Sequence, residues 1–477
     1  NATYEYVDAH HVHDVLPRSG SVNGGTLLNV SGTGFKNTSV LYCRFGSLPP
    51  VAGLYLTSTR VQCISPMHQI GSVSIEVTTN GVDYSEDMVQ YRYYASPAVS
   101  HIVPSSGPTE GGTVISVYGR NFIDSDSLNC RFGNESVVSG RWVSSDRVEC
   151  EVPALSAADI SIEITNNGMD YTSNKIQFTV LPESNVTFVH PSFGAVGAST
   201  SVTVHGSGFV FSRSLYCRFG LLSVAAMYVN STTVVCTAPD AAEGVVDVRV
   251  SSNGVDYSAS NATYEYVDAH HVHDVLPRSG SVNGGTLLNV SGTGFKNSSV
   301  LYCRFGSLPP VVGLYLTPTR VQCISPMHQI GSVSIEVTTN GVDYSEDMVQ
   351  YRYYASPAVS HVVPSSGPTE GGTVVSVYGR NFIDSDSLNC RFGNDSVVSG
   401  RWVSSDRVEC EMPALSAADV SIEITNNGMD YTSNKVQFTV LPESNVTLVH
   451  PSFGAVGAST SVTVHGSGFV FSRSLYC

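Results

Sequence analysis

Apolar and polar residues alternate in short segments along the whole chain. Leu28 and Val30 flank Asn29, and the same alternation recurs around Ser116 and Thr203. Because successive side chains of a strand point to opposite faces of a sheet, these segments predict strands with one buried face. The predicted buried residues are Leu28 and Val30, Ile115 and Val117, and Val202 and Val204.

A second set of alternating segments runs into an Asn-Gly pair, at positions 80, 167 and 253. Asn-Gly favours a type I′ hairpin turn, because both central residues of that turn need a positive φ. A closing strand with alternating apolar residues follows each pair. The apolar residues before the pairs are Val73, Ile75, Val77, Ile160, Ile162, Ile164, Val246, Val248 and Val250, and those after them are Tyr91, Tyr93, Phe178, Val180, Tyr264 and Tyr266.

Each group of segments opens with Pro-x-x-Gly, at 17, 104 and 191, which predicts a turn. About seven short strands with regular turns, and no convincing helical period, predict an all-β fold. The expected architecture is a β-sandwich.

The chain is an internal repeat on two scales. The block that begins at Asn1 begins again at Asn261, and residues 1–217 differ from residues 261–477 at ten positions. Within each 260-residue period, cysteines at 43, 130, 217, 303 and 390 are 87, 87, 86 and 87 residues apart. Repeats of this size predict separate small domains in tandem rather than the turns of a solenoid.

These repeats resemble the IPT/TIG family of immunoglobulin-like domains. The matching pattern is P-x-x-G, G-G-T, V-x-G-x-x-F, C-x-F-G, C-x-x-P and N-G-x-D-Y-S, and it covers essentially the whole chain. The third type of repeat departs from it, with Gly-Ala-Ser-Thr at 197–200 in place of Gly-Gly-Thr. The resemblance implies a tandem array of β-sandwiches. Its expected parts are the closing strand of a preceding domain at 1–10, complete domains at 11–97, 98–184, 185–270, 271–357 and 358–444, and the first half of a sixth at 445–477.

The charge of the chain argues against a nucleic-acid partner. Charged residues are only 13% of the chain, and the formal net charge is −16 with no basic block. Affinity for a phosphate backbone requires clustered Lys and Arg. No apolar run approaches the roughly 18 residues of a membrane helix, so no membrane segment is predicted. The absence of a starting Met and of a leader indicates that this is not a primary translation product.

Ten of the eleven cysteines form pairs by their spacing, which suggests one disulfide per domain, as in extracellular IPT members. Buried free thiols in a cytosolic protein are the alternative; a zinc site is disfavoured because no C-x-x-C spacing occurs. Cys477 corresponds to Cys217, so we expect its partner beyond the end of the sequence, in a continuing array; an intermolecular disulfide is the alternative. The predicted pairs are Cys43 and Cys63, Cys130 and Cys150, Cys217 and Cys236, Cys303 and Cys323, and Cys390 and Cys410.

Eleven Asn-x-Ser/Thr triplets also indicate a secreted or cell-surface chain. Two of the ten differences between the periods fall in these triplets, Thr38/Ser298 and Glu135/Asp395, and both leave the triplet intact. Ordinary surface and turn asparagines are the alternative. Separately, short proline motifs such as Leu48-Pro49-Pro50 and Ser96-Pro97 are candidates for hydroxyproline-linked sugars, with ordinary turn prolines as the alternative. The predicted N-glycosylation sites are Asn1, Asn29, Asn37, Asn134, Asn185, Asn230, Asn261, Asn289, Asn297, Asn394 and Asn445.

Few residues suggest chemistry. In an extended segment His11 and His13 of "DAHHVHD" point the same way, as metal-chelating pairs can, but a role at a domain boundary is simpler. Asp83, Asp170 and Asp256 follow the Asn-Gly pairs, and one carboxylate per turn is too few for calcium. No Gly-x-Ser-x-Gly elbow or carboxylate pair stands out. We therefore predict no enzyme, no metal and no cofactor beyond covalent N-linked glycans.

Two functions remain, both extracellular or at the cell surface. The first is a structural subunit of a glycan-coated fibril, whose partners are further copies of itself joined head to tail. The second is the stalk of an adhesion or receptor ectodomain, similar to plexin IPT regions. The near-identity of the 260-residue periods favours the fibril, because an array copied almost unchanged places the same interface at every joint.

Overall fold

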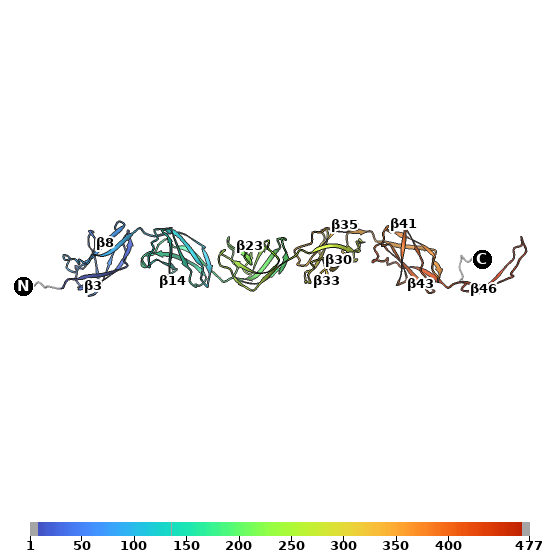
Figure 1. Ribbon diagram of the computed structural model, residues 1–477, viewed down its shortest axis with the longest axis horizontal. Coiled ribbons are helices and arrows are strands. Elements are labelled where there is room, and N and C mark those ends of the chain that lie inside the picture. Colours follow the sequence, from blue (N-terminus) through green and yellow to red (C-terminus); the bar gives the residue numbers. More distant parts are fainter. Residues whose placement is uncertain (1–7, 135, 470–477) are drawn as a thin grey trace, which may run out of the picture. The chain divides into compact units, whose positions relative to one another are not determined.

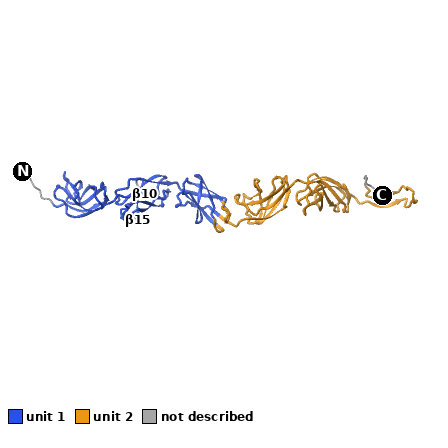
Figure 2. Ribbon diagram, turned by 90° about the horizontal axis from the view of Figure 1, so that it is seen from above, with its two compact units in different colours: residues 1–192, 201–239, 245–264 blue, residues 193–200, 240–244, 265–477 orange. Residues whose placement is uncertain are grey.

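The computed structural model describes residues 8–134 and 136–469 (Figure 1). Within these ranges the chain forms strands β1 to β46 and no helix. It divides into two compact units, which are described separately (Figure 2). Unit 1 contains Asn1–Ser192, Ser201–Pro239 and Val245–Tyr264, and unit 2 contains Phe193–Thr200, Asp240–Gly244 and Glu265–Cys477. The all-β prediction is confirmed.

Domain 1 comprises the first nine strands and lies in unit 1. They are β1 (His11–Leu16), β2 (Ser19–Ser21), β3 (Leu27–Thr33), β4 (Tyr42–Phe45), β5 (Val51–Ala52), β6 (Leu54–Thr57), β7 (Arg60–Ile64), β8 (Gly71–Thr78) and β9 (Val89–Tyr94). One sheet has the order β1-β3-β7-β6 and the other β2-β9-β8-β4-β5. Neighbouring strands are antiparallel except β2 and β9, which are parallel. The two sheets form the predicted sandwich.

The Pro-x-x-Gly segment is not the simple turn that we predicted. The Leu16–Pro17 peptide is cis, and the chain passes there from β1 in one sheet to β2 in the other. The segment therefore carries the chain from the edge of one sheet to the edge of the other. This crossing, and the break between β5 and β6 at Gly53, raise the strand count above the seven expected.

The other domains repeat this plan. Domain 2 consists of β10 (Ala98–Val103), β11 (Ser106–Pro108), β12 (Val114–Arg120), β13 (Asn129–Phe132), β14 (Ser136–Ser139), β15 (Arg141–Ser144), β16 (Arg147–Glu151), β17 (Ala158–Thr165) and β18 (Ile176–Leu181). Domain 3 consists of β19 (Asn185–His190), β20 (Phe193–Ala195), β21 (Ser201–Ser207), β22 (Tyr216–Phe219), β23 (Leu222–Asn230), β24 (Thr233–Thr237), β25 (Gly244–Ser251), β26 (Ala259–Ser260) and β27 (Thr263–Val267).

The second period follows in unit 2. Domain 4 consists of β28 (His271–Leu276), β29 (Ser279–Ser281), β30 (Leu287–Thr293), β31 (Tyr302–Phe305), β32 (Val311–Val312), β33 (Leu314–Thr317), β34 (Arg320–Ile324), β35 (Gly331–Thr338) and β36 (Val349–Tyr354). Domain 5 consists of β37 (Ala358–Val363), β38 (Ser366–Pro368), β39 (Val374–Arg380), β40 (Asn389–Phe392), β41 (Ser396–Ser404), β42 (Arg407–Glu411), β43 (Ala418–Thr425) and β44 (Val436–Leu441). The antiparallel pair β45 (Asn445–His450) and β46 (Thr463–Ser467) begins a sixth repeat.

The predicted alternation decides which side chains fill each core. Leu28 and Val30 are fully buried, whereas Asn29 between them is exposed. Phe45 packs edge-on against Tyr91, with ring centroids 5.7 Å apart. Burying such side chains stabilises the fold by about 1.5–3 kcal/mol each, which makes the mixed aromatic and β-branched core the main source of stability.

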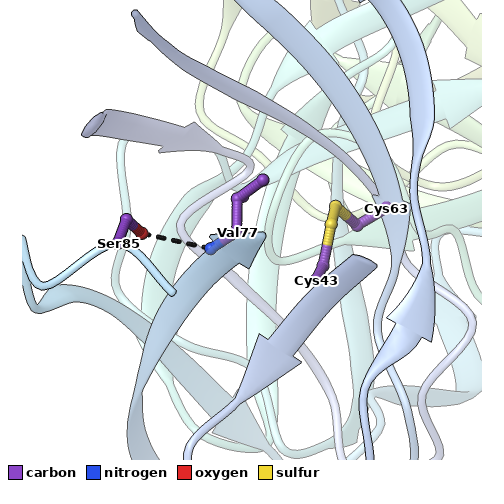
Figure 3. Close-up of a disulfide and its surroundings, with 4 residues drawn as sticks. All are labelled: Cys43, Cys63, Val77 and Ser85. Atoms are coloured by element: carbon purple, nitrogen blue, oxygen red, sulfur yellow. Dashed lines mark hydrogen bonds between the residues drawn. A yellow bond between two sulfur atoms is a disulfide. The ribbon is translucent and has the colours of Figure 1, made fainter. Parts of the chain in front are cut away.

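One disulfide joins the two sheets of domain 1. Cys43 lies on β4 and Cys63 on β7, in opposite sheets, and both are buried (Figure 3). The equivalent bonds are Cys130–Cys150, Cys217–Cys236, Cys303–Cys323 and Cys390–Cys410. Each domain is therefore closed by a covalent link within its core.

The Asn-Gly pairs do not form the predicted two-residue hairpins. In domain 1, β8 pairs with β9 from Ile75 and Val89 onward, so a longer loop separates the two strands. Gly81 has a positive φ of 77°, but Asn80 is not among the residues with positive φ. Ser85 closes the base of the loop, because its hydroxyl accepts a 3.1 Å hydrogen bond from the Val77 N–H (Figure 3). Side chains rather than a type I′ backbone turn hold this loop.

Candidate functional site

The loop that contains each Asn-Gly pair contacts the preceding domain. In domain 2 we call residues 165–172 the docking loop. The Thr26 hydroxyl of domain 1 donates a 2.6 Å hydrogen bond to Asp170 Oδ2, and Asn167 Nδ2 donates a 2.9 Å hydrogen bond to the carbonyl of Ser19. We call this pair of contacts the clasp. Both bonds join residues far apart in sequence, and both lie in unit 1.

Hydrogen bonds inside the docking loop preorganise the two clasp residues. Asn167 Oδ1 accepts from the Asp170 N–H at 2.9 Å, and Asn167 Nδ2 donates to Asp170 Oδ2 at 2.8 Å. Gly168 between them has a φ of 77°, a conformation that a β-carbon disfavours. The loop therefore presents a fixed amide and a fixed carboxylate.

Tyr171, which follows Asp170, anchors the docking loop to domain 2. The guanidinium of Arg131 stands 3.8 Å from the ring centroid of Tyr171, and Arg131 Nε donates to Glu163 across the sheet at 2.8 Å. The arginine of the repeated Cys-Arg-Phe-Gly sequence thus holds the docking loop against the sheet. The same arginine–tyrosine contact recurs as Arg44–Tyr84, Arg218–Tyr257, Arg304–Tyr344 and Arg391–Tyr431.

The receiving side of the clasp contains two closely packed glycines, Gly20 and Gly24. Thr26 is fully buried, and a β-carbon on Gly20 would lie 2.3 Å from its hydroxyl oxygen. A β-carbon on Gly24 would lie 2.7 Å from the carbonyl oxygen of Ser65. Glycine at position 20 therefore leaves room for the threonine hydroxyl, whereas domain 3 has Ala198 at the position of Gly24 and keeps the clasp.

The clasp occurs at four successive joints with nearly the same geometry. In every copy a threonine donates to the aspartate of the next domain, at 2.6–2.7 Å. Each asparagine donates to a backbone carbonyl at 2.8–3.0 Å. The threonine–aspartate pairs are Thr26–Asp170, Thr113–Asp256, Thr200–Asp343 and Thr286–Asp430, and the asparagines are Asn167, Asn253, Asn340 and Asn427.

The third type of repeat keeps the clasp despite its different sequence. In Gly-Ala-Ser-Thr, Thr200 still donates to Asp343, at 2.7 Å. Ser199 takes the positive φ, 52°, that Gly25 has in domain 1. The threonine is thus the essential residue of this motif for the joint.

The linker between domains 1 and 2 is held from both sides. The Ser96 hydroxyl shares a 2.6 Å hydrogen bond with the Ser21 hydroxyl, and the Asn23 amide donates to it at 2.9 Å. From domain 2, Asn121 donates to the Ser96 carbonyl at 2.8 Å. The equivalent Ser356 has the same three contacts in unit 2. These bonds restrict motion at the linker.

Ten of the eleven asparagines in predicted glycosylation triplets lie in the described part of the chain, and all ten are exposed. Exposure means that the fold accommodates a glycan at each site. Asn1 and Cys477 lie outside the described residues. The ten exposed asparagines are Asn29, Asn37, Asn134, Asn185, Asn230, Asn261, Asn289, Asn297, Asn394 and Asn445.

The histidine cluster forms hydrogen bonds within its own domain. His10 Nε2 bonds the Val77 carbonyl at 2.7 Å, and His11 Nδ1 bonds Asp87 at 2.9 Å. Over residues 8–134 and 136–469 there is no group of three or more His, Cys, Asp or Glu side chains that could hold a metal ion. The same residues contain no helix long and apolar enough to cross a membrane.

The second copy of the cluster predicts a pH effect. Burial lowers the pKa of His270 below 6.5, although its 2.7 Å hydrogen bond to the Val337 carbonyl and the charges of Asp343 and Asp347 oppose this shift. Below about pH 6.5 the unfolded chain therefore binds a proton that folded domain 4 resists. Each unit of pKa difference is worth about 1.4 kcal/mol.

We therefore expect domain 4 to lose stability as the pH falls from 7.5 to 5.5. His270→Gln keeps a hydrogen-bond donor and does not titrate, so it should reduce this loss. Urea unfolding monitored by hydrogen exchange of domain 4 peptides, at both pH values, measures the loss of stability in the parent chain and in the variant. An equal loss in the variant and the parent chain would show that His270 is not responsible.

The clasp is absent from the sequence-based predictions. The Asn-Gly-x-Asp motif predicts a hairpin, and its aspartate suggests only a calcium ligand, for which one carboxylate per turn is too few. The available signal was that this motif and a threonine near the start of each domain recur together in every repeat. That pattern fits a joint better than it fits a turn.

Comparison with known proteins adds a family and several relatives. A family model described as IPT/TIG domain matches residues 11–93, 97–180, 184–266, 271–353 and 357–440. Fibrocystin-L of Mus musculus is 26% identical over 378 residues, covering 73% of this chain and 8% of that protein. Plexin-2 of Caenorhabditis briggsae is 24% identical over 274 residues, covering 54% of this chain and 15% of that protein. The chain thus spans only a small part of these relatives.

Among solved structures, the full extracellular region of plexin A4 aligns with 97% of this chain and 56% of its own, with a TM-score of 0.32 and 13% identity. The two relatives named above, a fibrocystin-L and a plexin, are extracellular or cell-surface proteins. With the five disulfides, they confirm the predicted extracellular or cell-surface location.

Proposed function

The chain belongs to the IPT/TIG domain family, and on this premise we propose that it is a non-enzymatic spacer in the stalk of a cell-surface ectodomain. The spacer sets the distance between whatever lies at its two ends. This is the second of the two functions predicted from the sequence.

The repeated clasp is the observation that carries this proposal. The same threonine–aspartate and asparagine–carbonyl bonds join four successive pairs of domains. A domain that is fixed to its neighbour by specific polar contacts adds a constant increment of length. Hydrogen bonds to a charged group contribute about 1.5–3 kcal/mol each, enough to favour one arrangement of two domains over a freely hinged pair.

The relatives support a stalk more than a fibril. Sequence similarity to fibrocystin-L and Plexin-2 covers 73% and 54% of this chain. These two relatives do not support the predicted self-assembly into a glycan-coated fibril, which stays a prediction. The near-identity of the two periods is the one feature in its favour.

We extend the proposal to the surface of the stalk. The ten exposed asparagines of the described triplets carry N-linked glycans in our proposal, and these glycans supply solubility to domains with few charged residues. A sugar coat also keeps the exposed strand edges of neighbouring chains apart.

Solution scattering of the glycosylated chain, with light scattering after gel filtration at about 1 and 100 μM, tests the proposed function. Each domain should span about 30–40 Å. We therefore expect a monomer at both concentrations, with a largest dimension of about 150–200 Å for five domains in series. A compact particle in which domains fold back on one another would contradict a spacer. Filaments at the higher concentration would favour the fibril instead.

A further inference from the structure

A groove lies beside the clasp between domains 1 and 2. It has a volume of about 540 Å³ and is lined by Leu16, Arg18 and Asn29 of domain 1 and by Ser125, Ser127 and Met169 of domain 2. A matching groove of about 350 Å³ lies between domains 4 and 5, where Asn289 is one of the lining residues. Each groove lies within a single compact unit.

The lining of the groove is part apolar and part polar. Leu16 is 58% exposed and Met169 is 48% exposed; in the second groove Leu276 and Met429 are 58% and 50% exposed. Exposed apolar side chains that line a groove together with polar groups mark a candidate contact site. A pyranose ring has an apolar face of C–H groups and a rim of hydroxyls, so its chemistry matches this lining.

Asn29 stands in the groove with its glycosylation atom available. Its Oδ1 accepts a 3.0 Å hydrogen bond from Gln62 Nε2 of the neighbouring strand, which fixes the side chain. Nδ2, the atom that an N-glycan uses, has no partner in the described part of the chain. Asn289 and Gln322 repeat this arrangement at 2.9 Å.

The sequence brings these features together only at this kind of joint. The residues equivalent to Asn29 are Ser116 in domain 2 and Thr203 in domain 3, and neither can carry an N-glycan. The docking loop has Met169 in domain 2 but Val255 in domain 3. The triplet asparagine and the larger apolar side chain therefore meet where a first-type domain precedes a second-type domain.

We propose that the N-glycans on Asn29 and Asn289 occupy these grooves and connect the two domains on either side, beside the clasp. The proposal rests on the glycosylation proposed above and adds a mechanical role to it. The modification forms a bond between Nδ2 and C1 of the first sugar of a lipid-diphosphate-linked oligosaccharide. The bond from C1 to the diphosphate oxygen breaks, the lipid diphosphate leaves with the electron pair, and Nδ2 loses one proton.

Hydrogen exchange across the groove tests this role in the full chain, made in a secretory host. Site occupancy is first measured by glycopeptide mass spectrometry. We then compare the parent chain with Asn29→Gln/Asn289→Gln and with Ser31→Ala/Ser291→Ala, which removes the triplet but keeps the Asn29–Gln62 bond. The control is Asn37→Gln/Asn297→Gln, which removes glycans outside the groove.

We expect the amides of residues 125–127 and 166–169 to exchange at least threefold faster in both groove variants and at the parent rate in the control. If Asn29 carries a glycan in the parent chain and exchange is unchanged in the variants that lack this glycan, only the connecting role is overturned. Glycans at other asparagines but not at Asn29 and Asn289 would also overturn this inference alone. Absence of glycans from every triplet would overturn the proposed glycan coat as well.

Discussion

Replacing Cys130 and Cys150 with alanine should lower the free energy of unfolding of domain 2 by about 3–5 kcal/mol. The bond closes a loop of 20 residues. In the chain-entropy view a loop of this size contributes about 3 kcal/mol, and the removal of two buried sulfur atoms adds a cost for lost packing. Since small domains have a stability of about 5–15 kcal/mol in total, this is a large fraction of it.

The chain contains its own probe for this experiment. It has two tryptophans, Trp142 in domain 2 and Trp402 in domain 5, and each is 38% exposed. The indole N–H of Trp142 donates to the Phe122 carbonyl, and that of Trp402 donates to the Phe382 carbonyl. When urea unfolding is monitored by tryptophan fluorescence, the double alanine variant should therefore show two transitions. The Trp142 transition should occur at a lower urea concentration, and the Trp402 transition should be unshifted. The variant with Cys390 and Cys410 replaced should show the reverse. If both tryptophans reported a single common transition at the parent urea concentration in either variant, the disulfide would not stabilise its domain.

Much of the sandwich follows from local patterns in the sequence. The alternation at Leu28 and Val30 correctly identifies a buried face, because the period of a strand is a property of its own backbone. The crossing at Pro17 could not be predicted, since a cis peptide and a change of sheet depend on the strands that receive the chain. Pro-x-x-Gly fits an ordinary turn equally well.

Which copies of the Asn-Gly-x-Asp motif form the clasp could not be predicted, for a stronger reason. Residues 78–85 and 338–345 have the same sequence, Thr-Thr-Asn-Gly-Val-Asp-Tyr-Ser. Yet Asn340 is 2% exposed and bonded to the Phe193 carbonyl, whereas Asn80 is exposed and donates to Asp83 of its own loop. The difference comes from the neighbouring domain, which no local pattern in the loop encodes.

This pair of identical loops gives the clasp a matched test. Asp343→Ala should speed hydrogen exchange of the amides of residues 340–345 by about 10–100-fold, because it removes a charge-assisted hydrogen bond worth about 1.5–3 kcal/mol. Asp343 Oδ2 accepts from Thr200 at 2.7 Å and from Asn340 at 2.7 Å. Asp83 accepts the equivalent bond from Asn80 within its loop but has no threonine partner among the described residues. Asp83→Ala therefore removes only the bond within the loop.

The Asp83→Ala variant should therefore change exchange of residues 80–85 by less than about threefold, and the difference between the two variants isolates the contact across the joint. Thr200→Val tests the other partner and should reproduce most of the effect of Asp343→Ala. The double variant should add little, because both single changes remove the same bond. Equal effects of Asp343→Ala and Asp83→Ala would mean that the aspartate stabilises only its own loop. In that case the clasp would not hold domains 3 and 4 together. The constant increment of length on which a spacer depends would then have to come from other contacts, such as the linker bonds of Ser96 between domains 1 and 2 and of Ser356 between domains 4 and 5.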